Sequence, residues 1–142
     1  MKIQLTSKYL PTHMWILLSV YFVASLAHFA HNAEYIAFYP NMPAWLTREK
    51  VYLAWLVITS IGVVGLIAAR LRSYAIGAVL IAVYGAFGLD GLLHYTLALC
   101  SQHTLVTNIT IWSEALSGLV LVFAASVAAT RTFVVDESVG RP

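Results

Sequence analysis

Seven histidine and carboxylate side chains fall inside, or at the ends of, long apolar runs of this 142-residue sequence. Ionisable groups are costly inside a membrane, so each of them indicates a function. Imidazole and carboxylate groups bind transition metals, and they also exchange protons in acid–base catalysis. The seven residues are His28, His31, Glu34, Asp90, His94, His103 and Glu114.

The spacing of these groups predicts which of them share a helix face. His28, His31 and Glu34 follow one another at i, i+3 and i+6, which spreads them over about 120° of helix surface. Asp90 and His94 stand at i and i+4 and should stack on one face. A further set steps by four and three residues, which predicts a polar seam that faces the interior of a helix bundle. This seam consists of His103, Thr107, Thr110, Glu114 and Ser117.

The elements that carry these groups are apolar segments of a length typical of membrane-spanning helices. The chain is 61% hydrophobic and only 10% charged, whereas a soluble domain carries about 25% charged residues. Runs of about 20 apolar residues match the thickness of a bilayer. We expect spans at about residues 14–38, 51–69, 73–97 and 105–130. The sequence therefore predicts an all-α integral membrane protein, in which residues 1–142 form a single four-helix bundle with up-down-up-down topology.

Small residues in the third span predict close helix packing there. Gly77, Gly85, Gly88 and Gly91 all fall in this span, and in membranes such residues let helices approach one another closely. Gly88 and Gly91 flank Asp90, so a neighbouring helix can come near it.

Charge and cysteine content exclude other classes of protein. The net charge of +2 comes from eight scattered Lys and Arg residues, which provide no basic face for nucleic acid. The single cysteine, Cys100, excludes an intramolecular disulfide and a cysteine-based metal cage. We interpret Cys100 as an inert loop thiol and His13 as an interfacial residue.

The distribution of basic residues predicts the orientation in the membrane. Arg48 and Lys50 lie on one side of the four-span arrangement, and six basic residues lie on the other. By the positive-inside rule, both termini are then cytoplasmic and the chain sits in a plasma membrane, the inner membrane of a bacterium. An alternative is a cleaved signal peptide ending near Ala27, but the apolar run continues well past that residue. The six basic residues are Lys2, Lys8, Arg70, Arg72, Arg131 and Arg141.

The position of each ionisable group along its predicted span places all of them in the same half of the membrane. All seven fall in the extracytoplasmic half, with His28, Asp90 and Glu114 about 10–15 Å below the outer surface. We predict a site open to the outer face that binds a transition metal (Zn, Fe, Mn or Cu). Its predicted ligands are His28, His31, Asp90 and His94.

Glu34 and Glu114 are the candidate catalytic residues of this site. Each could be a further ligand, a group that orients a ligand, or a general base. The substrate would be a lipid or isoprenoid that enters from the bilayer, and the reaction would be that of a metal-dependent hydrolase, oxidoreductase or isomerase.

Two other functions remain open from the residues. One is a metal-free isomerase or hydrolase of an apolar substrate, with Glu114 or Asp90 as proton donor. The other is a non-enzymatic subunit or assembly factor whose polar seam binds another membrane protein or a second copy of the chain. For any single histidine, a hydrogen bond between helices is an equally good explanation.

The stretch from His31 to Tyr35 (His-Asn-Ala-Glu-Tyr), followed by Tyr39-Pro40 and by Pro-Ala-Trp-Leu at 43–46, resembles a known signature. It is similar to that of small four-span membrane proteins with a His-x-x-Glu-Glu (HXXEE) motif. Here Tyr35 stands at the position of the second Glu. The resemblance implies the four-span architecture and singles out His31 and Glu34, and it implies no particular chemistry.

Overall fold

The computed structural model describes residues 10–71 and 73–139, with side chains described up to residue 132. Each predicted span is helical. The first two are α1 (Thr12–Glu34) and α2 (Arg48–Leu71). The third contains α3 (Tyr74–Ala86), the 3₁₀ helix η2 (Phe87–Leu93) and the short α4 (His94–Leu97), and the fourth is α5 (Leu105–Val139). Two further 3₁₀ turns, η1 (Ile36–Phe38) and η3 (Cys100–Gln102), lie in the connectors.

The predicted four-helix, all-α architecture is confirmed. Four helices are long and apolar enough to cross a membrane, and among the described residues none forms a β-strand. The largest differences from the predicted boundaries are at the end of the first span and at the end of the fourth. α1 ends at Glu34, where η1 begins a connector that contains Pro40 and Pro43, and α5 continues beyond Thr130.

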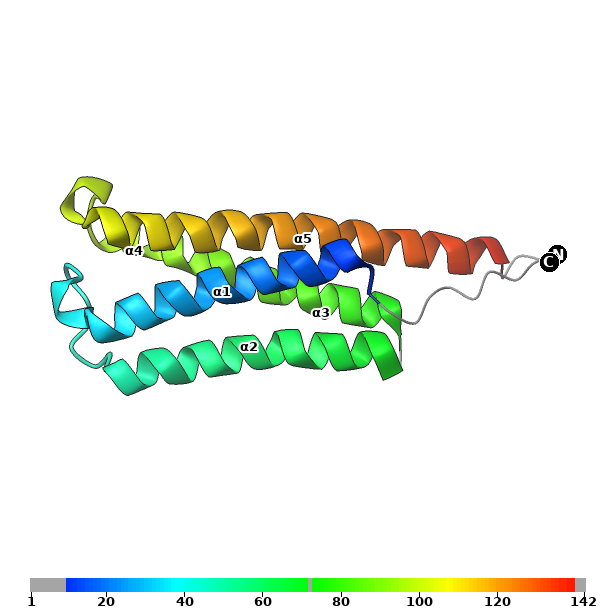
Figure 1. Cartoon of the computed structure of the whole chain (residues 1–142), viewed down its shortest axis with the longest axis horizontal. Helices are drawn as coiled ribbons and strands as arrows, with labels where there is room; N and C mark the ends of the chain where they lie inside the picture. The colour runs from blue at the N-terminus through cyan, green and yellow to red at the C-terminus, as the bar shows by residue number, and fades with distance from the viewer. Residues whose placement is uncertain (1–9, 72, 140–142) are drawn as a thin grey trace.

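The spans are arranged as the four corners of a bundle. α1 packs against α2 and α5, and α3 packs against α2 and α5. The start of α1, the α2–α3 turn and the far end of α5 share one end of the bundle, which we call the terminal end (Figure 1). The α1–α2 connector and η3 share the opposite end, which we call the loop end. Asn41, in a left-handed conformation with φ of 58°, donates a hydrogen bond to the carbonyl of Leu97 and ties the two loops together.

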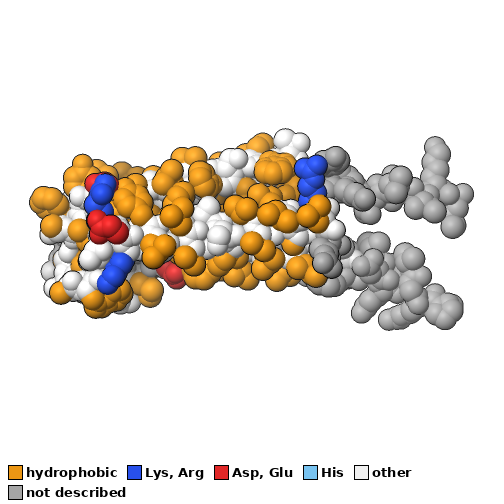
Figure 2. All heavy atoms as spheres, turned by 90° about the horizontal axis from the view of Figure 1, so that it is seen from below, with side chains coloured by type: hydrophobic (Ala, Val, Ile, Leu, Met, Phe, Trp, Pro, Cys, Tyr) orange, Lys and Arg blue, Asp and Glu red, His pale blue; other side chains and the backbone are white. Residues whose placement is uncertain are grey.

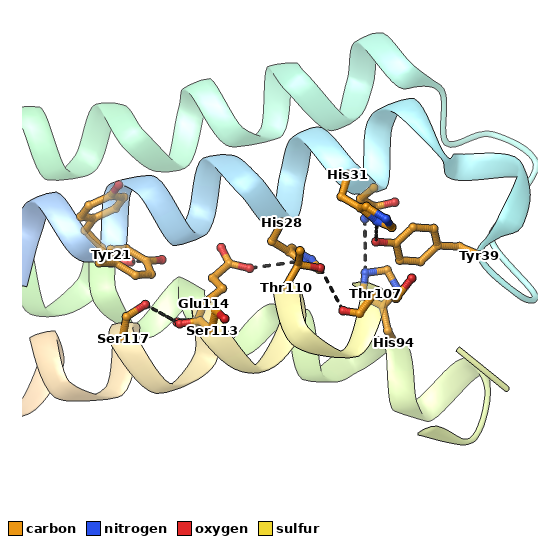
Figure 3. A network of polar contacts seen from close by, with 12 residues as sticks. Tyr21, His28, His31, Tyr39, His94, Thr107, Thr110, Ser113, Glu114 and Ser117 are labelled. Carbon is orange, nitrogen blue, oxygen red and sulfur yellow. Dashed lines mark hydrogen bonds and ion pairs between the residues drawn. The ribbon is translucent and has the colours of Figure 1, made fainter. Parts of the chain in front are cut away.

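An apolar core fills the terminal half of the bundle. It contains Met14, Leu18, Ile81 and Leu121, all buried, and it ends at Tyr21. The Tyr21 hydroxyl donates to the backbone carbonyl of Tyr84 over 3.0 Å. The polar residues of the bundle interior lie beyond this core, toward the loop end (Figure 3).

The outer surface is the one that a bilayer requires. Hydrophobic side chains occupy much of the middle of the face shown in Figure 2, acidic and basic side chains lie toward one end, and basic side chains lie at the other. Arg48 and Lys50 begin α2 at the loop end, while Arg70 and Arg131 lie toward the terminal end. Lys2, Lys8, Arg72 and Arg141, which also entered the orientation prediction, lie outside the described residues.

Candidate functional site

A buried imidazole and a buried carboxyl face one another in the loop half of the bundle. His28 Nε2, from α1, lies 3.7 Å from Glu114 Oε2, from α5, and both side chains are at most 3% exposed. This separation is longer than a direct hydrogen bond, and Figure 3 shows the two side chains pointing toward one another. His28 Nδ1 and both carboxyl oxygens of Glu114 have no hydrogen-bond partner among the described residues. Such atoms cost free energy until a partner binds them.

Glycine residues bring the backbone close to this pair. A Cβ atom at Gly91 would lie 3.4 Å from Glu114 Oε2 and 3.6 Å from His28 Nε2. At Gly88 it would lie 2.9 Å from the backbone carbonyl of Glu114, so α5 and η2 pack with almost no side chain between them. The predicted close approach in the third span is therefore observed beside the pair.

A second tier of polar and aromatic groups lies between the pair and the loop end. The rings of His28 and His94 are 5.4 Å apart, and Asn32 Nδ2 lies 3.2 Å from His94 Nε2. His31 Nδ1 pairs with the Tyr39 hydroxyl at 2.8 Å, and the Tyr39 ring lies 5.0 Å from that of His94. The histidines of α1 and α4 are thus linked through Asn32 and Tyr39.

Two features of the loop end define the state of this tier. His103 Nδ1 lies 3.0 Å from the carbonyl oxygen of Leu99, and because a carbonyl only accepts, Nδ1 carries the proton of this hydrogen bond. Burial raises the pKa of the Tyr39 hydroxyl to about 12, with neighbouring Thr107 and Thr110 acting in the opposite direction. Tyr39 is therefore a neutral hydrogen-bonding group over the whole physiological pH range.

A pocket of about 210 Å³ reaches this site from the surface of the bundle. His28, Asn32, Gly91 and His94 contribute its polar wall and floor, while Glu114 lies behind His28 and Gly91. Leu93, 60% exposed, stands at its rim. The apolar remainder of the wall comes from Phe29, Met42, Leu46 and Leu97.

Asp90 does not share a face with His94, although both line this pocket. Asp90 is exposed, whereas His94 is buried. The i, i+4 prediction assumed α-helical geometry, but the chain is a 3₁₀ helix from Phe87 to Leu93. At about three residues per turn, four steps turn a side chain by roughly 120° instead of 40°. Asp90 therefore lies exposed at the rim of the pocket, and His94 lies buried within the bundle.

Glu34 lies on the surface and outside the bundle interior. Its Oε1 accepts hydrogen bonds from Arg48 Nη2 at 2.6 Å and from the Tyr52 hydroxyl at 2.8 Å. The pair joins the last residue of α1 to the first of α2. In the structure, Glu34 thus fastens two helices near the loop end.

The four predicted metal ligands are only partly brought together. His28 and His94 are neighbours, Asp90 is at the rim of their pocket, and His31 is engaged by Tyr39. In the part of the chain that the structure describes, no group of three or more His, Cys, Asp or Glu residues is placed to hold a metal ion. Metal binding stays a prediction that this geometry does not support.

Asn32 and Tyr39 belong to the site but were not singled out from the sequence. Asn32 extends the series Tyr21, Ser25 and His28, all buried, in steps of four, three and four residues. That spacing is the same signal that predicted the seam on α5, which the structure confirms: His103, Thr107 and Glu114 are buried. Tyr39 lies in the connector and folds back onto the bundle, so no helical period could have revealed it.

Comparison with known proteins provides no further information about this site. No family model matches the chain, and no curated protein or solved structure was found to be similar to it.

Proposed function

We propose that the bundle is a metal-free proton-transfer enzyme, an isomerase of an apolar molecule that enters the His28 pocket from the bilayer. One observation carries this proposal: His28 lines a pocket whose wall is mainly apolar, and behind it lies the buried carboxyl of Glu114, with polar atoms of both side chains left unpartnered among the described residues. Apolar walls with a few convergent polar groups are typical of small-molecule sites, and the volume of about 210 Å³ suits a small molecule or one end of a longer one.

The pair can move one proton without any co-reactant. His28 Nδ1 takes a proton from an acidic carbon of the substrate, and the imidazolium is then paired with the carboxylate of Glu114 through Nε2. Asn32 and His94, on the same wall, can donate a hydrogen bond to a carbonyl oxygen on which the negative charge of the substrate collects. His28 returns the proton to a different carbon, a double bond shifts, and the protein ends unchanged.

The pocket fits a substrate that is dissolved in the membrane. Its rim residue Leu93 and its wall residues Phe29 and Leu97 present apolar side chains. Transfer of an apolar molecule from the lipid into the pocket should therefore cost little free energy. The chemistry requires a carbonyl group next to an acidic C–H, because only a delocalised anion can hold the charge between the two steps. We therefore expect an apolar unsaturated ketone as the substrate, because only a carbon–carbon double bond near the carbonyl lets the proton return to a different carbon.

Solvent deuterium tests this proposal while the substrate is still unidentified. Full-length protein in lipid nanodiscs is incubated in D₂O with the total lipid extract of the cells that produced it, and the lipids are examined by mass spectrometry. The proton on His28 exchanges with solvent, so we expect one lipid species to gain deuterium at carbon. Glu114→Gln cannot balance the imidazolium, and we expect it to slow labelling about 10²-fold or more.

Glu49→Gln is the matched control, because Glu49 is an exposed carboxylate at the start of α2. It should label as wild type does. If wild-type protein labels no lipid, or if Glu114→Gln labels as fast as Glu49→Gln, the proposal is wrong.

Metal content separates this proposal from the metal-dependent alternative. Two imidazoles, those of His28 and His94, and the carboxyl of Glu114 are ligand types that suit zinc, iron, manganese or copper. We expect labelling to survive chelation. Stoichiometric metal in protein supplemented with these ions, lost in His94→Ala and retained in Glu49→Gln, would instead favour the metal site.

A further inference from the structure

A second pocket, remote from His28, opens between α1 and α2 in the middle and terminal half of the bundle. Its volume is about 380 Å³, within the range of about 300–1,000 Å³ typical of ligand sites. Trp15, Leu18 and Phe22 of α1 face Leu66 of α2 across it. Tyr84 of α3 forms its floor, with its ring laid against Gly62, where a Cβ atom would come within 2.7 Å of the ring.

Two hydroxyl groups in this pocket lack hydrogen bonds. Tyr84 is 3% exposed, and neither its hydroxyl nor that of Thr59 has a partner of acceptable geometry among the described residues, although the two hydroxyls are neighbours. Thr59 differs in this from other threonines of the spans. Thr110, Thr130 and Thr132 each donate their hydroxyl to a carbonyl of their own helix.

The depth of these hydroxyls limits what can satisfy them. Thr59 lies eleven residues after the first residue of α2 and twelve before the last, which is the middle of the span. Water is scarce at that depth, and the acyl tails that fill it offer no hydrogen-bonding atom. An acyl tail in the pocket would therefore add no hydrogen bond to either hydroxyl.

We propose that this pocket binds a neutral isoprenoid-like alcohol or ketone, with its oxygen between Thr59 and Tyr84 and its hydrocarbon body along Trp15, Phe22 and Leu66. The two hydroxyls can each donate and accept, so they match a single hydroxyl or carbonyl oxygen. The aromatic and aliphatic walls match the hydrocarbon. This site is separate from the His28 pocket and does not depend on the function proposed for it.

Binding of the fifteen-carbon alcohol farnesol, compared with the hydrocarbon farnesene, tests this proposal. Full-length protein in phosphatidylcholine nanodiscs is titrated with radiolabelled farnesol, and empty nanodiscs give the background. We expect saturable farnesol binding that excess farnesene displaces only weakly. Thr59→Val and Tyr84→Phe should each weaken farnesol binding about three- to tenfold, the usual effect of one hydrogen bond.

Two control variants make the result specific. Thr59→Ser keeps the hydroxyl and should bind as wild type does, and Thr130→Val removes a hydroxyl outside the pocket and should also have no effect. Glu114→Gln should bind farnesol normally, so failure of the proton-transfer proposal would not affect this one. If farnesene displaces farnesol as well as farnesol itself does, or if Thr59→Val and Tyr84→Phe bind normally, the pocket recognises no oxygen and the proposal is wrong.

Discussion

Glu114 and Glu34 are both carboxylates of the loop half of the bundle, and their surroundings assign them different roles. Glu114 is 1% exposed, and His28 Nε2 lies 3.7 Å from its carboxyl oxygen. Glu34 is exposed and held by Arg48 and Tyr52. The first arrangement is expensive and indicates chemistry, whereas the second is an ordinary surface ion pair.

We therefore expect Glu34→Gln to keep the deuterium labelling that Glu114→Gln loses. An exposed ion pair is screened by solvent and contributes little to stability, so the melting temperature should change hardly at all. Labelling rate and melting temperature, measured on both variants in the same nanodiscs, check this. A loss of labelling in Glu34→Gln without unfolding would place Glu34 in the reaction after all.

Tyr39 gives the stability of the protein a dependence on alkaline pH. Its hydroxyl has a pKa of about 12 in the folded protein, because it is buried, and of about 10 in an unfolded chain. Between these values the unfolded state binds fewer protons, so the free energy of unfolding falls as pH rises from about 10 to 12. We expect Tyr39→Phe to remove part of this fall. Melting temperatures of both proteins at pH 9, 10 and 11 measure it, and parallel curves would show that Tyr39 does not contribute.

At the scale of elements, η2 is the segment that shapes the site. It replaces two turns of α-helix by 3₁₀ geometry next to Glu114 and His28, and its Gly88 and Gly91 face α5. Mid-helix 3₁₀ segments are often found at functional positions. Here the segment turns Asp90 out to the rim and leaves His94 inside.

We expect alanine at the two glycines of η2 to change different properties: the stability of the protein at position 88 and the rate of labelling at position 91. Gly88→Ala would place a Cβ atom 2.8 Å from Tyr21 and 2.9 Å from the Glu114 carbonyl, so it should destabilise the protein by about 1–3 kcal/mol. The Cβ atom of Gly91→Ala makes only ordinary van der Waals contacts, so the variant's free energy of unfolding should stay within about 1 kcal/mol of the wild-type value. Its methyl group, however, lies against both His28 and Glu114 and should slow labelling. Equal melting temperatures for the two variants would contradict this packing.

The same element shows where sequence reasoning stops. The apolar runs and the spacing from His103 to Ser117 predicted the four helices and the buried face of α5, because both follow from a helical period. Glycine-containing Phe87–Leu93 carries no signal that separates 3₁₀ from α geometry, so the sequence could not show that Asp90 is exposed while His94 is buried. Glu34 was placed near the interior because its partner Arg48 is brought to it only by the fold of the connector.

At the scale of the whole molecule, the bundle is divided into a polar half and an apolar half. The polar groups run from His103 and Tyr39 at the loop end to Tyr21 near the middle. Beyond Tyr21, the core of Met14, Leu18, Ile81 and Leu121 contains no ionisable side chain. The buried histidines and carboxyl of the described interior therefore lie toward the loop end, and the side of the membrane that this end faces decides from which side the proposed His28 site is reached.

Cys100 can report that side, because it is the single cysteine of the chain and lies exposed in η3 at the loop end. We expect the loop end to face away from the cytoplasm, on the positive-inside rule applied to the basic residues. A membrane-impermeant maleimide should then label Cys100 in intact cells. The matched control is Cys100→Ser combined with Arg131→Cys, which moves the only thiol to an exposed position toward the terminal end. It should react only after the membrane is made permeable. The opposite pattern, with Cys100 protected and the residue 131 thiol labelled in intact cells, would reverse the orientation and open the His28 site to the cytoplasm.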